Sequence, residues 1–176
     1  MEKENVNHPS HYNQHPAGIE CIDVIRHYTC DIANALKYLW RAGLKIDADK
    51  TVIVKEIEDL KKALWYIEDY QSNAVGLKAH QSPWSEVLPH PTTALLRKTN
   101  GTRVTKLTVR DVTGYTVGQI SNSYCEPIRK AFCCLLLIGI IRDGHVFVCE
   151  DWQQRIEWAK EDINERINNL KQQMED

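Results

Sequence analysis

The sequence lacks the features that would place it in several common protein classes. Six cysteines form no CxxC pair, and the adjacent Cys133 and Cys134 lie in an apolar run, which favours buried structural thiols over zinc ligands. No signal-like segment opens the chain, and the longest apolar run, 131–141, is too short to cross a bilayer. We therefore expect a soluble, cytoplasmic protein without a membrane partner.

The motifs of the usual nucleotide enzymes are also absent. The chain contains no GxxxxGK[ST] phosphate loop, no GxGxxG after a strand, no kinase signature and no GxSxG elbow. A net charge of -2, with 26% charged residues, gives no general affinity for polyanions. Any affinity for phosphate must therefore come from a local cluster of side chains.

The hydrophobic pattern predicts a mainly α protein with a small β component. Three helices are expected in the first seventy residues: 18–28, a second capped by Asp31 and ended by Gly43, and 51–70. The third has a continuous apolar seam, made by Ile53, Ile57, Leu60, Leu64 and Ile67. This seam could pack against the first two helices or against another copy of the chain, and we expect a homo-oligomer.

The second half of the chain has a different pattern. We expect a strand at 103–109, helices at 116–121 and 126–141, a turn at 142–145, a strand at 146–149 and a long helix at 151–174. The prediction is therefore an amino-terminal three-helix domain (1–72), a linker (73–92) and a carboxyl-terminal α+β domain (93–176). The latter resembles a winged helix-turn-helix followed by a long terminal helix. Nucleic acid is nevertheless an unlikely partner, because the recognition-helix candidate offers only Arg129 and Lys130.

Candidate binding residues gather on one face of the second predicted helix. Asn34, Lys37, Tyr38 and Arg41 lie at offsets of zero, three, four and seven, opposite the apolar stripe. Arginine can grip phosphate oxygens bidentately, lysine adds a point charge, and tyrosine can stack on a base. The same face could equally be a solvated helix surface, and the spacing alone leaves both interpretations open.

Two neighbouring segments add rings and cations. The third predicted helix carries Trp65 and Tyr66 on nominally outer positions, where a ligand or a second subunit would bury them. Before the first helix, His8, His11 and Tyr12 are interleaved with prolines, which suits either a ligand-binding segment or one that covers the helical core.

Four ordered blocks of sequence resemble a phage nucleotide-kinase-like family. They are NHPSHY (7–12), GIE with IDVI (18–25), KYLWRAGLK (37–45) and EDLKKALWY (58–66), and together they span about residues 5–70. The resemblance implies a phage or prophage source and an oligomeric, helical deoxynucleoside monophosphate kinase without a phosphate loop. It implies a nucleotide-binding site made of His8, His11, Tyr12, Glu20, Asp23, Lys37, Tyr38, Arg41, Lys45, Asp59, Lys62 and Tyr66, which Asn34 joins through its helix face alone.

Two functions fit such a site, and a third is weaker. As a kinase, the protein would hold transferring phosphates with Lys37, Arg41 and Lys45, and Glu20 or Asp23 would orient the acceptor or a Mg²⁺ ion. As a sponge, it would sequester a cyclic or modified nucleotide signal of bacterial anti-phage immunity without turnover. The third candidate is a DNA-binding regulator that uses the helix-turn-helix-like region.

Overall fold

The computed structural model describes residues 9–73, 95–98, 104–142, 145–149 and 151–175. The fold is mainly helical with a small β component, as predicted. Its helices are α1 (Ser10–Asn13), α2 (Cys21–Ile25), α3 (Cys30–Arg41), α4 (Val52–Asn73), α5 (Val109–Thr113), α6 (Val117–Ser121), α7 (Glu126–Leu135) and α8 (Trp152–Glu175). Two antiparallel hairpins join β1 (Leu95–Lys98) to β2 (Val104–Leu107) and β3 (Ile138–Arg142) to β4 (His145–Val148).

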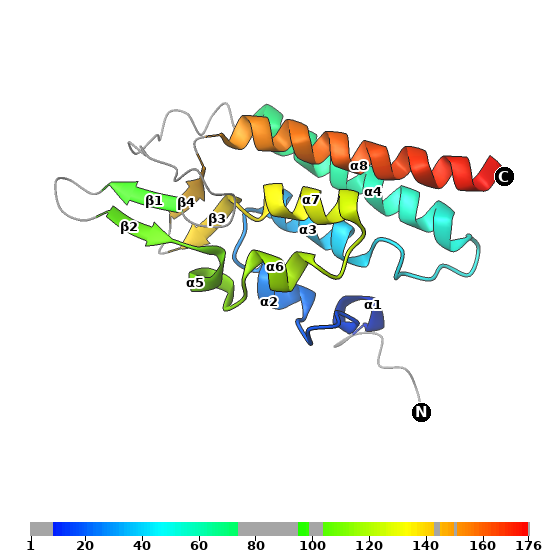
Figure 1. Cartoon of the computed structure of the whole chain (residues 1–176), viewed down its shortest axis with the longest axis horizontal. Coiled ribbons are helices and arrows are strands. Elements are labelled where there is room, and N and C mark those ends of the chain that lie inside the picture. Colours follow the sequence, from blue (N-terminus) through cyan, green and yellow to red (C-terminus); the bar gives the residue numbers. More distant parts are fainter. Residues whose placement is uncertain (1–8, 74–94, 99–103, 143–144, 150, 176) are drawn as a thin grey trace.

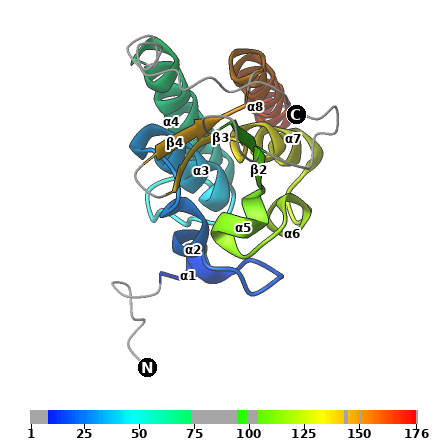
Figure 2. The same ribbon diagram turned by 90° about the vertical axis from the view of Figure 1, so that its left-hand side faces the viewer.

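The two longest helices, α4 and α8, run side by side along one edge of the molecule (Figure 1). Helix α3 packs on α4, and α7 packs on α8, which makes a second layer beneath the first (Figure 2). The short helices α1, α2, α5 and α6 lie on the other side of that second layer. The amino-terminal segment is thereby placed against α3, which carries the candidate site residues Asn34, Lys37, Tyr38 and Arg41.

One hydrophobic core runs through both halves of the chain. The predicted apolar stripe of α3 is fully buried, and α4 adds Leu60 and Ile67. Helices α7 and α8 contribute Phe132 and Ile163 to the same cluster. The predicted boundary between domains falls on residues 73–92, of which only Asn73, the last residue of α4, lies within the described part. The division into domains therefore stays a prediction.

Several boundaries differ from those predicted. The first helix is shorter than 18–28, and α3 takes Thr29 as its N-cap, so Asp31 lies in the first turn and is not the cap. The predicted helix 126–141 was wrong beyond Leu135, since 138–142 forms β3. A buried apolar run suits either element. Here Gly139 has a φ of 70°, which is incompatible with a helix and coincides with a bulge between Ile138 and Ile140 in β3, and its carbonyl accepts a hydrogen bond from Thr29 N at 2.7 Å.

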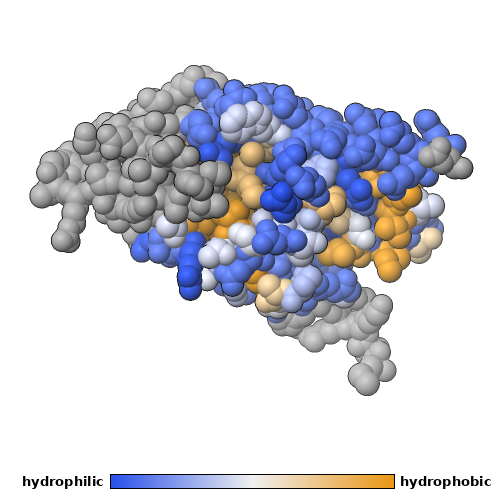
Figure 3. Space-filling view, in the orientation of Figure 1, coloured by the Kyte–Doolittle hydropathy of each residue, from blue (hydrophilic) through white to orange (hydrophobic). Residues whose placement is uncertain are grey.

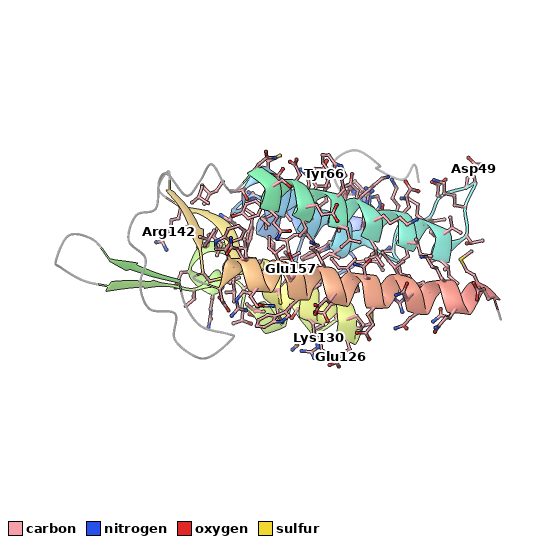
Figure 4. The ribbon with its side chains drawn as sticks, turned by 90° about the horizontal axis from the view of Figure 1, so that it is seen from above. Asp49, Tyr66, Glu126, Lys130, Arg142 and Glu157 are labelled. Atoms are coloured by element: carbon pink, nitrogen blue, oxygen red, sulfur yellow. The ribbon has the colours of Figure 1, made fainter. Side chains whose placement is uncertain are left out.

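Helix α7, the candidate recognition helix, is covered on several sides. It packs against α3, α6 and α8. Of its outward-facing cations, Arg129 and Lys130 both lie within ion-pair distance of Glu126, at 3.3 and 3.6 Å. Figure 4 shows Glu126 and Lys130 on the edge of the molecule opposite to Tyr66 of α4. The surface of α7 is therefore separate from the site described below.

Candidate functional site

A buried carboxylate organises the cations between α3 and α4. Asp59 is fully buried, and its two oxygens accept hydrogen bonds from Arg41 Nε at 3.1 Å and Arg41 Nη2 at 2.8 Å. Lys55, one helical turn before Asp59, donates to the same carboxylate at 2.8 Å. The side chains of Arg41 and Lys55 are only 10% and 4% exposed, so both cations are held out of bulk water. Two buried cations thus share one buried anion.

The third nitrogen of the guanidinium connects this network to the amino-terminal segment. Arg41 Nη1 donates to the Tyr12 hydroxyl at 3.1 Å. Each guanidinium nitrogen of Arg41 therefore has a protein partner, and the fork that the sequence assigned to phosphate is held by Asp59. We name Tyr12, Arg41, Lys55 and Asp59 the Asp59 network. In this geometry Arg41 positions its neighbours and adds charge, and it does not offer an open bidentate fork.

Cations also gather around the ring of Tyr38. Lys37 Nζ lies 4.9 Å from the ring centroid, the Arg41 guanidinium carbon 4.5 Å and Lys62 Nζ 5.8 Å. The ring stacks on Tyr66 with centroids 5.7 Å apart, and Figure 4 shows Tyr66 on the edge of α4 that faces away from α8. Lys62 is also paired with Glu58 and Arg41 with Asp59, whereas Lys37 donates to the neutral side chain of Asn34. The surface therefore presents positive charge beside a pair of stacked rings.

A pocket opens between α1, α2 and α3, next to these cations. Its volume is about 300 Å³, at the lower end of the range for small-molecule sites. Tyr12, Glu20 and Lys37 supply polar groups, while Cys21, Ile22 and other residues make it largely apolar. We name it the α2 pocket. Lys37 belongs both to its wall and to the cations around Tyr38, so the two features form one continuous site.

Two further titratable groups, His11 and Lys45, lie close to the cations of this site. The pKa of His11 is lowered by burial and then by the charges of Lys45 and Arg41. The pKa of Lys45 is lowered by burial and then by Arg41 and Lys55. Burial is the larger cause of both shifts; neighbouring positive charges add to it, and the charge of Asp59 opposes it. An anion placed among these groups would be attracted and would favour protonation of His11.

The structure brings most of the predicted site residues together, with two exceptions. Asp23 pairs with Arg26 at 2.8 Å on an exposed surface of α2 and does not line the α2 pocket. His8 lies outside the described residues. Asn34 accepts a hydrogen bond from Lys37 and so steadies that ammonium group beside Tyr38.

Sequence reasoning missed Lys55. The spacing of Lys55 and Asp59, four residues apart on one helix, was the signal that could have revealed it. Glu58 accepts hydrogen bonds from Lys62 and, at 2.6 Å, from Lys50, and these two hydrogen bonds lower its pKa to about 2. The ion pairs on α4 are therefore more extensive than a single surface pair.

The amino-terminal segment docks through His15. Its Nδ1 accepts a hydrogen bond from Ala17 N at 3.2 Å, and its Nε2 lies 2.9 Å from both the Ile120 carbonyl oxygen and the Ser123 hydroxyl. Because Nδ1 is an acceptor, Nε2 carries the ring hydrogen and donates. His15 thus fastens the segment that carries His11 and Tyr12 to the region around α6.

Comparison with known proteins gives one match. Residues 6–68 match the model of a family described as a protein of unknown function, DUF3310. No curated protein and no solved structure matches the chain. The matched range contains the α2 pocket, the Asp59 network and the stacked tyrosines, and it ends within α4.

Two further observations concern metals and membranes. Within the part of the chain that the structure describes, no three His, Cys, Asp or Glu side chains gather in a way that could hold a metal ion. Among the described helices, none combines the length and apolar character needed to cross a membrane.

Proposed function

We propose that the protein binds a nucleotide, with phosphate held by the cations around Tyr38 and the ring system in the α2 pocket. The observation that carries this proposal is the position of Lys37, which lines the pocket and also lies over the Tyr38 ring. A ligand with an apolar, ring-shaped part joined to an anionic part matches that arrangement. Nucleotides have this composition.

The charge distribution supports a phosphate ligand. Lys37 lines the pocket, Lys62 lies near the stacked rings while paired with Glu58, and Lys45 is close enough to Arg41 and Lys55 to feel their charges. Charge-assisted hydrogen bonds to phosphate are among the stronger polar contacts in proteins. Asp59 is already bonded to Arg41 and Lys55, so its charge is largely compensated inside the protein. A bound anion would balance the remaining positive charge.

The size of the pocket supports a mononucleotide. About 300 Å³ accommodates one small ligand, whereas phosphoryl transfer also requires a donor. Glu20 lies at the pocket and Asp23 does not, so of the two carboxylates considered for the acceptor or Mg²⁺ only one is in place. Because Mg²⁺ in such sites is held by one or two carboxylates together with substrate phosphates, Glu20 is the one of these two carboxylates that could contribute to it.

Two outcomes of binding are therefore proposed. By its resemblance to the phage nucleotide-kinase-like family, the protein phosphorylates a deoxynucleoside monophosphate. Alternatively it retains its ligand as a sponge in the cytoplasm of an infected bacterium. The second is favoured by the occupied fork of Arg41, since a residue locked onto Asp59 is less able to follow a moving phosphoryl group.

A second copy of the chain is a further proposed partner. Trp65 is 58% exposed next to Tyr66 on α4, and Ile46 is 82% exposed in the connection between α3 and α4. Figure 3 shows hydrophobic side chains gathered below the carboxyl-terminal half of α8, whose own outer side is hydrophilic. Burial of such groups between subunits would be favourable.

The test combines turnover and retention in one experiment. The protein is incubated with ATP and each labelled deoxynucleoside monophosphate, and in parallel with labelled cyclic nucleotides, and both the product and the ligand recovered after heat denaturation are identified. A diphosphate product supports the kinase, and unchanged ligand that co-elutes in gel filtration supports the sponge. Failure to bind or convert any nucleotide refutes the proposal.

Matched variants locate the binding site. Lys37→Ala and Lys62→Ala each remove an ammonium group near Tyr38, and we expect each to weaken binding by about 10-fold or more, because a charge-assisted hydrogen bond contributes roughly 1.5 to 3 kcal/mol. Lys61→Ala is the control, since Lys61 is exposed on the same helix. Equal affinities for all three variants would place the ligand elsewhere.

A further inference from the structure

We infer that the Asp59 network orients the Tyr12 hydroxyl as a hydrogen-bond donor to an acceptor oxygen of the bound nucleotide, and that Lys55 is required for this orientation. The inference rests on the proposed function, since it concerns the same pocket. It gives Tyr12, which the resemblance already placed in the site, the specific role of a donor, and it gives Lys55 a role in binding.

The hydrogen bond between Arg41 and Tyr12 has a fixed direction. A guanidinium has only donors, so the Tyr12 oxygen accepts from Arg41 Nη1. A phenol has one hydrogen of its own, which must then point to another acceptor. Among the residues that the structure describes, no acceptor for this hydrogen is found, while the Tyr12 side chain lines the α2 pocket. A ligand oxygen in the pocket would satisfy it.

Asp59 holds Arg41 in place. The Asp59 carboxylate occupies the edge of the guanidinium formed by Nε and Nη2, which directs Nη1 toward Tyr12. A side-on, two-bond contact of this kind fixes the guanidinium plane as well as its position. The orientation of the Tyr12 oxygen thus depends on the position of the Asp59 carboxylate.

Lys55 fixes that carboxylate. It donates to Oδ1 of Asp59 at 2.8 Å and lies 3.5 Å from Glu58, while its own side chain is 4% exposed. Lysine is rarely buried to this extent, and a single Arg41–Asp59 pair would already be neutral without it. The additional cation stops the carboxylate from rotating and adds positive charge close to the pocket. Lys55 and Asp59 are therefore positioning residues that act through Arg41 and Tyr12.

A double-mutant cycle tests the inference. Affinities for the four deoxynucleoside 5′-monophosphates are measured by titration calorimetry for the wild type, Tyr12→Phe, Lys55→Met and the double variant. Tyr12→Phe removes one hydrogen bond and should weaken binding about 10-fold. Lys55→Met should weaken binding by a similar factor. In the Lys55→Met background, Tyr12→Phe should then change affinity by less than about 3-fold, because its donor is no longer aligned.

A purely structural role for Lys55 predicts a different result. Tyr12→Phe would then keep its full factor in the Lys55→Met background, and that result overturns the inference. Lys55→Arg retains a donor and a charge and should restore most of the affinity, as well as the sensitivity to Tyr12→Phe. Should Lys55→Met not fold, as circular dichroism would reveal, the same cycle with Lys55→Gln replaces it. Tyr115→Phe and Lys61→Met are the matched controls outside the pocket, and neither should change affinity.

The failures are distinguishable. A wild type that binds none of the monophosphates overturns this inference, and one that also binds no cyclic nucleotide refutes the proposed function as well. A wild type that binds, combined with a Tyr12→Phe variant of equal affinity, overturns only the inference about Tyr12. Multiplicative effects of Tyr12→Phe and Lys55→Met would show that Tyr12 contributes without help from Lys55.

Discussion

The fully buried Asp59 provides the sharpest test of how the site is held together. Asp59→Asn keeps the shape of the side chain but removes the charge that Arg41 and Lys55 share. Both cations are then left with side chains that are 10% and 4% exposed and no compensating anion in contact with them, apart from Glu58 at 3.5 Å from Lys55. Breaking a buried ion pair in this way costs about 3 to 5 kcal/mol.

The control is the neighbouring carboxylate on the same helix. Glu58 has two lysine partners, but its side chain is 31% exposed, so Glu58→Gln should lower the free energy of unfolding by less than about 1 kcal/mol. Urea denaturation followed by circular dichroism measures both variants. We expect Asp59→Asn to be the less stable variant by at least about 2 kcal/mol. Equal stability of the two variants would show that the Asp59 network is not the buried, coupled unit described above.

Three further predictions concern pH and backbone conformation. The pKa of His11 is lowered by burial and by the charges of Lys45 and Arg41, so binding of an anion should raise it, and nucleotide affinity should increase as the pH falls from 7.5 to 6. His11→Asn should abolish this dependence in titrations at the two pH values, and an unchanged dependence in the variant would exclude His11 from the site. The pKa of Glu58 is lowered to about 2 by its hydrogen bonds to Lys50 and Lys62, so the stability that it contributes is present above pH 4.5 and is lost as the pH falls toward 2. In acid-unfolding curves, the difference in free energy of unfolding between wild type and Glu58→Gln should shrink over that window, and a constant difference would contradict the assignment. Gly139→Ala would place a Cβ 2.5 Å from Thr29 Oγ1 at a φ of +70°, so we expect thermal unfolding to show a free energy of unfolding lower by about 1 to 3 kcal/mol. Gly114→Ala is the control: Gly114 is also at positive φ, but its Cβ would meet nothing within 4 Å, so this variant should lose less stability.

The helical part of the fold could be predicted well because its signals are local. The seam of α4 repeats over many turns, and the structure buries Ile57, Leu60 and Ile67 and partly buries Ile53 and Leu64. Helix α8 likewise buries apolar residues along its length, from Ile156 to Leu170. The end of α7 could not be predicted in the same way, because the apolar run 131–141 suits a buried helix or a buried strand. The choice depends on pairing between Gly139 and Thr29, which are far apart in the sequence.

The candidate site shows the same division between local and long-range information. The face that carries Asn34, Lys37, Tyr38 and Arg41 follows from helical spacing alone, and the structure places cations around the Tyr38 ring. The partner of Arg41 was not predictable from that face. Asp59 lies on another helix. Arg41 binds Asp59, and not an external phosphate, because α3 packs against α4 and brings the two side chains together.

The buried positive charge connects the stability of this region to its proposed function. A fold that needed only stability would be served equally well by apolar side chains at these positions, because burying charge is costly even when the charges are paired. Lys55→Met leaves Arg41 and Asp59 as a neutral pair, so its stability should equal or exceed that of the wild type, in contrast to Asp59→Asn. A variant that gains stability while it loses nucleotide affinity would show that Lys55 is retained for binding. A loss of both by Lys55→Met would show instead that the network is primarily a structural support.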